Sequence, residues 1–403
     1  MSKVLCKSCD LVVELPPYTK GYQCVCPNCG ALLRPATIES EFNVAIVAIS
    51  AFILAIICIF QPYMEISSMG VRSSLSLVSI FTILDYEWSG LLYVFLMVTF
   101  ISPLVVLMII SFLGIFKDYK PSPFTVKIYS ICHYFSMVDV FILGVLVSLI
   151  KLSSLAEVKF YSGFYISFLF SILLVWCCIR YRPERLWNRV MAYNIDAAQA
   201  GVRGKEQQLK VCRFCGMPFH AESDEDKCPR CGSKVHWRNH QWFQKSLCLL
   251  IAALILYLPS NLYPVMYTEF LFSETGANII QGVIAMWDMQ SYFVALVILL
   301  ASIFIPIFKI IALGLILYTV KNNIKINSKR ASKLYRIVLF IGRWSMIDVF
   351  VVIIMSSVVR MSGLLTISPG FAIVCFCAVV FITILAADEF DERLIWDNKY
   401  ARK

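Results

Sequence analysis

The chain has 403 residues, of which 59% are hydrophobic and 15% are charged. These values exclude an ordinary soluble protein, because soluble domains carry about 25% charged residues, and they favour a chain that lies mostly in lipid. The formal net charge of +10 is weak evidence for nucleic-acid binding, since the cytoplasmic loops of membrane proteins accumulate Lys and Arg.

Residues 1–35 predict a zinc ribbon. Two CxxC pairs, Cys6 with Cys9 and Cys26 with Cys29, offer four thiolates at the spacing of a tetrahedral Zn²⁺ site. Four protein ligands leave no open coordination position, so we expect a structural metal. Cys24 is a fifth candidate, but its spacing fits a bystander better than a ligand.

Eight apolar runs make up most of the remaining chain. Each is about as long as the roughly 20 residues that cross a bilayer as a helix. They lie near residues 42–62, 89–116, 127–150, 160–181, 245–266, 291–320, 334–358 and 369–388. Four prolines stand within or at the ends of these runs, and kinks or breaks are expected there: Pro62, Pro103, Pro264 and Pro306.

The loops between some of these runs predict structure of their own. Short stretches at 64–77, 157–161 and 363–367 can each add strands, so we expect a small sheet on the outer face of each bundle. The loop 267–290 contains no basic residue, and its apolar stretch 279–287 predicts an amphipathic helix on the surface.

A second predicted zinc ribbon lies between the fourth and fifth runs, at 208–238. Its four thiols again stand in two CxxC pairs, Cys212 with Cys215 and Cys228 with Cys231. The glycines that follow Cys29, Cys215 and Cys231 suit a turn with positive φ. By spacing, His220 and His236 are bystanders, and the chain is expected to hold two zinc ions.

The two halves of the chain repeat. The sequence SMVDVF at 136–141 recurs as SMIDVF at 345–350, and both ribbons contain a CPxCG turn. The repeat divides the chain into a ribbon at 1–35 with a four-span bundle at 36–195, then a ribbon at 208–238 with a second bundle at 240–398. The loops after even-numbered spans hold most of the basic residues, so both termini and both ribbons are expected in the cytoplasm, with the bundles side by side.

Four charged residues fall inside the predicted spans: Lys309, Arg343, Asp348 and Asp139. A charge at a helix centre costs about 2.5 to 3.5 kcal/mol on insertion scales, so such groups normally pair or border a wet cavity. Our preferred hypothesis is an ion pair between Lys309 and Asp348. Arg343 is expected near the cytoplasmic end of its helix, where snorkelling explains it equally well.

Motifs of catalysis are missing from the sequence. We find no phosphate-binding loop, no glycine-rich dinucleotide fingerprint and no GxSxG turn, so an enzyme is not expected. Basic residues around the ribbons are better explained by membrane topology than by nucleic acid. A redox or metal sensor that uses the ribbon thiols stays open as an alternative.

Taken together, these motifs resemble the paraquat-inducible protein A (PqiA) family, which includes the LetA (YebS) proteins. The resemblance rests on both ribbons and on the segments LPSNLYPVM at 258–266, RWSMIDVF at 343–350 and FDERLIWD at 390–397, so it spans nearly the whole chain. Two departures concern the first ribbon, which carries the extra Cys24 and has Asp10 where the other CxxC turns have Gly.

The resemblance implies a subunit of a lipid transport system in the inner membrane of a Gram-negative cell. Such a subunit works with a periplasmic MCE-domain protein that forms a tunnel toward the outer membrane, and its cargo is phospholipid. The family fold is similar to tetraspanin-like bundles with a small periplasmic sheet, and its intramembrane polar network corresponds to Lys309, Asp348 and Asp139. An outward-opening cavity in the second bundle is then expected at Lys309. A membrane scaffold that only seats the partner is the alternative.

Overall fold

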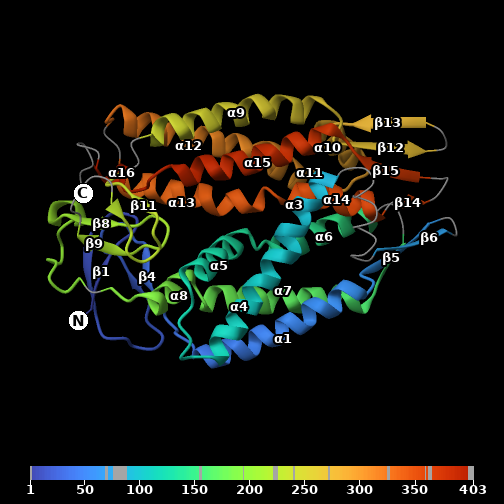
Figure 1. Ribbon diagram of the computed structural model, residues 1–403. Coiled ribbons are helices and arrows are strands. Elements are labelled where there is room, and N and C mark those ends of the chain that lie inside the picture. The colour runs from blue at the N-terminus through green and yellow to red at the C-terminus, as the bar shows by residue number, and fades with distance from the viewer. Residues whose placement is uncertain are drawn as a thin grey trace.

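The computed structural model places the ribbons at one end of the molecule, the strands of two outer sheets at the other, and two helical bundles between them (Figure 1). We call these the ribbon end and the sheet end; both chain termini lie at the ribbon end. The structure describes residues 2–68, 71–75, 89–153, 157–193, 195–220, 226–238, 241–270, 273–324, 327–358, 360–361 and 365–397.

The first repeat begins with two small hairpins and continues into four helical passes. Its elements are β1 (Ser2–Leu5), β2 (Val12–Leu15), β3 (Cys24–Val25), β4 (Leu32–Arg34), α1 (Glu41–Phe60), β5 (Met64–Ser68), β6 (Val71–Leu75), α3 (Ser89–Leu96), η1 (Met97–Ile101), α4 (Ser102–Ile115), α5 (Pro123–Phe135), α6 (Val138–Ser153), β7 (Glu157–Phe160), α7 (Ser162–Arg180) and α8 (Pro183–Val190).

The second repeat follows the same order. Its elements are η2 (Gly204–Gln207), β8 (Leu209–Val211), β9 (Pro218–His220), β10 (Asp226–Lys227), β11 (Lys234–Val235), α9 (Trp242–Leu262), β12 (Met266–Phe270), β13 (Ser273–Ala277), α10 (Ile279–Asp288), α11 (Tyr292–Ile298), η3 (Leu299–Phe304), α12 (Ile305–Lys321), α13 (Ser328–Trp344), α14 (Ile347–Val358), β14 (Arg360–Met361), β15 (Leu365–Pro369), α15 (Phe371–Glu389) and α16 (Leu394–Asp397).

Seven helices in the described chain are long and apolar enough to cross a membrane. They correspond to seven of the eight predicted runs, so the chain is a multi-pass membrane protein. The run predicted at 334–358, like the one at 127–150, consists of two helices: α13 and α14 are joined by the non-helical residues Ser345 and Met346. It is not among the seven helices, so the eighth span stays a prediction.

The SM(V/I)D motif interrupts a helix in both repeats. Ser136 and Met137 separate α5 from α6, as Ser345 and Met346 separate α13 from α14, although neither break contains Pro or Gly. The acid of each motif then falls in the first turn of a helix that begins inside the bundle. The positive end of the helix dipole favours a carboxylate at that position.

Two of the four prolines mark a local change of helix type. Pro103 and Pro306 each follow a π-helical turn, η1 or η3, and occupy the first turn of the α-helix behind it. The chain is helical on both sides of each Pro, so the π turn changes the hydrogen-bond register just before the residue that lacks an N–H. Pro62 and Pro264 lie just beyond the ends of α1 and α9.

An antiparallel sheet stands at the outer end of each bundle. In the first, β5 lies between β6 and β7; in the second, β12 lies between β13 and β15, and β14 adds an edge strand. The sequence predicts strands in three of these loops, but it does not predict β12 and β13. The helix expected at 279–287 is present as α10, and a capping box between Asn278 and Gln281 fixes its start.

A glycine follows the last strand of each sheet and allows a close approach of two chain segments. A Cβ atom on Gly370 would overlap the carbonyl oxygen of Pro264, and one on Gly163 would overlap that of Pro62. The two pairs occupy matching places in the repeats. Each Pro follows the first long helix of its bundle, α1 or α9, and each Gly lies at the start of the helix that follows the sheet, α7 or α15.

We expect Gly370→Ala to lower the free energy of unfolding by about 1–3 kcal/mol, because the backbone on one side must move to relieve the overlap. The measurement is the thermal unfolding midpoint of the purified protein in detergent. Gly314→Ala in α12 is the matched control, since its Cβ would meet open space and Ala is the better helix former. Equal midpoints for the two variants would show that this close approach is not needed.

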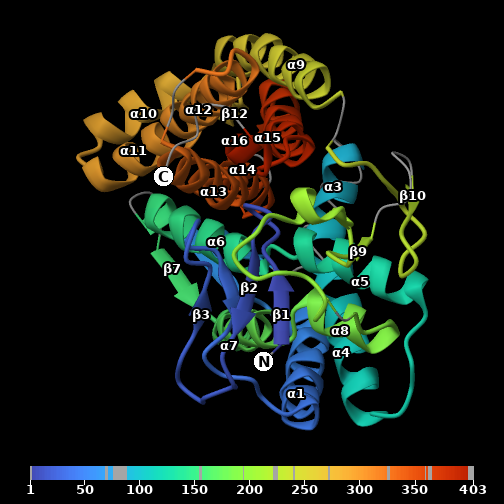
Figure 2. The ribbon, with the colours of Figure 1, turned by 90° about the vertical axis from the view of Figure 1, so that its left-hand side faces the viewer.

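The two bundles lie side by side and meet through the repeated motif (Figure 2). Helix α6 packs against α14, and the rings of Phe141 and Phe350, which occupy the same motif position, meet edge to face with centroids 5.8 Å apart. Phe95 contacts both rings, and a Cβ on Gly144 would lie 3.0 Å from that of Phe350. The interface therefore pairs equivalent residues of the two repeats.

Candidate metal centres and intramembrane polar groups

All four CxxC turns have the same backbone geometry. In each, the amide of the residue that follows the second cysteine donates to the carbonyl of the first cysteine, at 2.8–2.9 Å. That residue has positive φ in every turn: 70° at Gly30, 68° at Gly216, 70° at Gly232 and 62° at Asp10. The expected role of the glycines is confirmed, and Asp10 adopts the left-handed conformation without being Gly.

The structure brings the eight predicted cysteines together into two groups of four. Within each group the sulfur atoms lie within 4.8 Å of one another, and the nearest pairs are 3.5 Å apart. A Zn²⁺ ion with four sulfurs at about 2.3 Å needs sulfur–sulfur distances of about 3.8 Å, so the donor set fits the metal. The groups are Cys6, Cys9, Cys26 and Cys29, and Cys212, Cys215, Cys228 and Cys231.

Short contacts between the thiols also change pKa values within each group. The contact with Cys29 lowers the pKa of Cys26, and that with Cys212 lowers the pKa of Cys228. Each group thus contains a sulfur that ionises readily, and the thiolate is the form that binds metal. Cys24, His220 and His236 lie outside both groups; Cys24 instead accepts a hydrogen bond from Arg34, at 3.5 Å.

Asp10 joins the first ribbon to the rest of the ribbon end. Its carboxylate is buried and accepts hydrogen bonds from the Arg238 guanidinium, at 3.0 Å, and from the Lys205 amide, at 3.2 Å. Arg238 also donates to Asp397, at 2.6 Å. Burial raises the pKa of Asp10, and Arg238 opposes that shift. The side chain that replaces Gly in the first CxxC turn therefore connects ribbon, linker and C-terminal segment.

Each ribbon packs against the bundle of the other repeat. The first-ribbon cysteines Cys6, Cys9 and Cys26 share a hydrophobic cluster with Tyr335 and Phe390 of the second bundle. Polar contacts join the first ribbon to both bundles: Ser8 and Cys29 lie beside Glu392 and Arg336 of the second bundle, whereas Lys7 pairs with Glu184 of the first, at 3.1 Å. A ribbon that precedes one bundle in sequence thus supports the ribbon end of the other.

The second ribbon mirrors this arrangement on the first bundle. Its four cysteines share a cluster with Trp187, and Phe214 packs edge to face on that indole with ring centroids 6.0 Å apart. Lys127 of α5 lies over the same phenyl ring, 6.0 Å from its centre. Arg230 donates to the Asn188 side chain, at 3.3 Å. Each ribbon therefore contacts the bundle of the other repeat, and Arg213 of the second ribbon also donates to the Glu389 carbonyl of its own bundle, at 3.2 Å.

Lys309 is the buried intramembrane cation. It lies in α12 with 2% of its surface exposed, and its ammonium donates to the Thr383 hydroxyl of α15, at 2.8 Å. Thr383 in turn donates to the Val380 carbonyl, at 2.9 Å. A Cβ on Gly342 of α13 would lie 4.0 Å from the ammonium. Among the described residues, three helices enclose the Lys309 side chain, and the outward-opening cavity expected beside it stays a prediction.

The other two charges of the second bundle are placed by their backbones only. Asp348 is the second residue of α14, and its side chain lies outside the described part, so its ion pair with Lys309 stays a prediction. Arg343 stands fifteen residues after the start of α13, about 22 Å of helix from the ribbon end. It therefore lies close to the end of α13 that is far from the ribbons, and its snorkelling stays a prediction.

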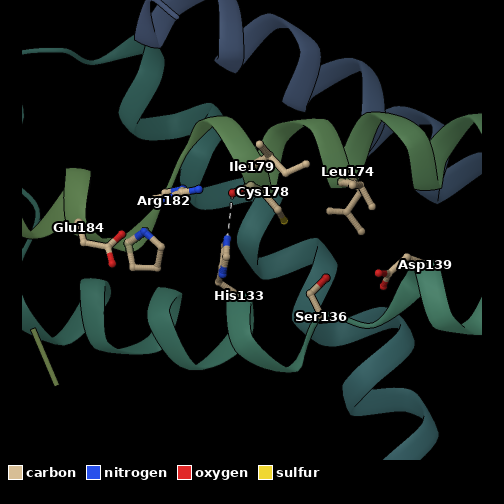
Figure 3. A pocket seen from close by; sticks show the side chains of 10 residues that line it. His133, Ser136, Asp139, Leu174, Cys178, Ile179, Arg182 and Glu184 are labelled. Carbon is tan, nitrogen blue, oxygen red and sulfur yellow. Dashed lines mark hydrogen bonds between the residues drawn. The ribbon is translucent and has the colours of Figure 1, made fainter. Parts of the chain in front are cut away.

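Asp139 lies in the first bundle, where no lysine corresponds to Lys309. The residue aligned with Lys309 is Val106, which is fully buried. Asp139 is half-buried in the first turn of α6, and Figure 3 shows its carboxylate on the side of the break that faces α7. The two bundles thus differ in their polar interiors although their backbones repeat.

Thr383 is the functional candidate that sequence reasoning missed. It is the single hydroxyl in the apolar stretch 371–385, and a search for lone polar residues inside predicted spans would have found it. The sequence contains no comparable signal for the contact of each ribbon with the bundle of the other repeat. This contact depends on which of two similar bundles a ribbon meets.

Comparison with known proteins identifies relatives over the full length. A family model described as "Paraquat-inducible protein A" matches residues 43–191 and 243–400. The chain is 34% identical to "Intermembrane transport protein PqiA" of Escherichia coli K12, over 98% of this chain and 96% of that protein. It is 27% identical to "Probable intermembrane transport protein" of Haemophilus influenzae, over 97% and 95%.

A more distant relative carries the second name expected from the sequence. The chain is 25% identical to "Lipophilic envelope-spanning tunnel protein A" of Escherichia coli K12, over 97% of this chain and 90% of that protein. Identity is thus higher with PqiA than with this protein. No solved structure matches the chain, so the tetraspanin-like comparison stays a prediction.

Proposed function

Because the chain belongs to the paraquat-inducible protein A family, we propose that it is the inner-membrane subunit of a lipid transport system. It passes phospholipids between the inner membrane and a periplasmic MCE-domain tunnel partner, which leads toward the outer membrane. The observation that carries this proposal is the 34% identity, over 98% of the chain, to a protein named as an intermembrane transport protein.

The proposed role is not enzymatic. The buried Cys₄ groups have the geometry of structural zinc sites, whose four protein ligands leave no position for substrate or water. In this proposal two zinc ions stabilise the ribbon end, and no nucleic acid takes part. The ribbons comprise residues 1–35 and 208–238, and the transport bundles residues 36–195 and 240–398.

The ribbon end is assigned to the cytoplasm. Thirteen of the basic residues fall between Arg180 and Lys245, a segment that begins and ends at this end of the bundles. Lys and Arg accumulate in loops that stay in the cytoplasm. The sheet end then faces the periplasm, where the strands and α10 are available to the tunnel partner.

Purification from the native membrane tests this function. We expect mass spectrometry to find phospholipid and an MCE-domain polypeptide bound to the chain. With both proteins, fluorescent phospholipid in donor vesicles should reach acceptor vesicles; with either protein alone it should not. Transfer that proceeds equally without this chain, or purification with an unrelated companion, would contradict the proposal.

One observation favours a second function, that of a membrane scaffold that seats the partner without carrying lipid. Lys309 is enclosed by α12, α13 and α15 with 2% of its surface exposed, so in this conformation it does not border a space that a headgroup can enter. Substitution of Lys309 separates the two functions, as argued in the Discussion.

A further inference from the structure

A pocket of about 440 Å³ lies in the first bundle, between the α5–α6 break and the end of α7. This volume falls in the range of small-molecule sites, about 300–1,000 Å³. Figure 3 shows His133 and Ser136 on one side of this space and Leu174 and Cys178 of α7 on the other. The pocket is lined by His133, Ser136, Asp139, Leu174, Val175, Cys178, Ile179, Arg182, Pro183 and Glu184.

The pocket carries opposite charges at its two ends. Arg182 and Glu184 stand at the ribbon end, whereas Asp139 stands at the deep end, beside the helix break (Figure 3). Glu184 is already paired with Lys7, at 3.1 Å. Asp139 has no lysine at the position that Lys309 occupies in the second bundle. The site therefore offers a cation near the membrane surface and an anion deeper in the bundle.

A buried hydroxyl between the charges is also available to a ligand. Ser136 has 8% of its surface exposed, and its Oγ has no hydrogen-bond partner among the described residues. Leaving such a group unpaired costs about 1–3 kcal/mol, so a polar ligand that reaches it is favoured. His133 is oriented toward the α7 side of the pocket by a 3.1 Å hydrogen bond with the Cys178 carbonyl.

The surroundings of the pocket suit a molecule with an apolar tail. Ile179 has 57% of its surface exposed and borders both this pocket and a neighbouring one of about 490 Å³ between the first ribbon and the end of α7. Arg182 and Glu184 line both pockets as well. A ligand whose headgroup occupies the first pocket can therefore place its apolar tail against these side chains. They lie where the membrane meets the ribbon end.

We propose that this pocket binds the headgroup of an aminophospholipid, whose phosphate meets Arg182 and whose primary ammonium meets Asp139. The inference rests on the proposed function, since it names the lipid class that the transport subunit takes up. A purely anionic headgroup would leave Asp139 without a cation, and a free cation would make no use of Arg182, whose acidic neighbour Glu184 is also paired with Lys7. The shared chemistry, phosphate with ammonium, is found in phosphatidylethanolamine and in free glycerophosphoethanolamine.

Native mass spectrometry of the full chain, titrated with phosphatidylethanolamine or phosphatidylglycerol, tests the proposal. A charge-assisted hydrogen bond is worth about tenfold in affinity, so the wild-type chain should prefer phosphatidylethanolamine by about that factor. Asp139→Asn should abolish this preference, whereas Arg182→Gln should weaken both lipids about tenfold. Matched controls away from the pocket, Asp118→Asn and Arg330→Gln, should bind as the wild type does.

A thiol-protection measurement covers the case in which a variant fails to fold. Cys178 lines the pocket, while its neighbour Cys177 is fully buried and serves as an internal control in the same peptide. In wild-type protein, phosphatidylethanolamine vesicles should slow maleimide labelling of Cys178, and phosphatidylglycerol vesicles should not. Millimolar glycerophosphoethanolamine should protect Cys178 as well if the headgroup alone is recognised; protection by the vesicles alone would show that the acyl chains contribute.

The outcomes separate this inference from the proposed function. Equal binding of the two lipids by the wild type, together with unprotected Cys178, would overturn the pocket assignment even if vesicle transfer proceeds. Selective binding that is lost in Asp139→Asn, without any vesicle transfer, would support the pocket and contradict the transport function.

Discussion

Replacement of Cys26 and Cys29 with serine will release one of two metal ions per chain and loosen the bundle of the opposite repeat. Structural zinc sites contribute about 10–16 kcal/mol in small domains, comparable to or greater than the total stability of most proteins. The first ribbon should therefore unfold without its metal. Elemental analysis should find zinc falling from about two ions to about one per chain.

The location of the damage follows from the packing of each ribbon on the bundle of the other repeat. The first ribbon packs on Tyr335 and Phe390 of the second bundle, so hydrogen–deuterium exchange should rise most at the ribbon end of α13 and after α15. The mirrored variant, Cys228→Ser with Cys231→Ser, should instead raise exchange in α8 and the start of α5, where Phe214 packs.

The control is Cys24→Ser, which should retain two zinc ions because Cys24 lies outside the four-sulfur group. Exchange that rises mainly in the bundle of the same repeat would contradict this packing. Full zinc occupancy in the Cys26 and Cys29 variant would remove these residues from the ligand set.

Much of this fold could be predicted, because strong local signals specify it. An apolar run of about 20 residues has few stable conformations in lipid other than a helix, and four thiols at ribbon spacing have few arrangements around a metal. Seven spans and both Cys₄ groups are confirmed on that basis. The repeat is also visible, since both copies of SM(V/I)DVF lie at the same helix break.

The helix breaks at Ser136 and Ser345 could not be predicted from Pro or Gly, which neither motif contains. The apolar run continues through them, so hydropathy predicts one span. A weaker signal was present: serine followed three residues later by aspartate resembles the start of a helix, where acids interact favourably with the helix dipole. Recognising that pattern inside a membrane span would have located both breaks.

The contact of each ribbon with the bundle of the other repeat depends on a choice that local sequence does not specify. The two bundles share their chain order and motifs, so each ribbon meets two similar surfaces. Particular side chains make the difference: Ser8 and Cys29 meet Glu392 and Arg336, whereas Phe214 meets Trp187. Such long-range pairings became visible only in the folded chain.

Lys309→Met is expected to abolish lipid transport while the protein still folds and inserts. Methionine replaces the long side chain with an apolar one that can fill the same space, so packing among α12, α13 and α15 is retained. The ammonium is the property that is lost. Vesicle transfer measures the effect, and expression with zinc content confirms that the fold is intact.

Thr383→Val separates the effect of the Lys309 charge on transport from the effect of its hydrogen bond on stability. Valine removes the oxygen that accepts from Lys309 and leaves a buried ammonium without that partner, which should cost about 1.5–3 kcal/mol of stability. The double variant, Lys309→Met with Thr383→Val, should recover that stability, since no buried charge then remains. It should not recover transport, because transport depends on the ammonium.

The same pair of variants decides between transporter and scaffold. A scaffold needs only the packing of α12, α13 and α15. Lys309→Met would then transfer lipid at the wild-type rate, and the proposed use of this charge would fail.

In a transporter, the ammonium is enclosed in one conformation and exposed in another. The equilibrium between these two conformations depends on how strongly each one stabilises the ammonium. The Thr383 hydroxyl stabilises the enclosed state by accepting a hydrogen bond from the Lys309 ammonium, so loss of this hydroxyl should shift the chain toward the open state. The test uses a reporter cysteine at Gly342, beside Lys309, and a water-soluble maleimide. At low temperature, where the Thr383→Val protein stays folded, this cysteine should react faster than it does without the Thr383→Val change. Labelling at the same rate would contradict the opening.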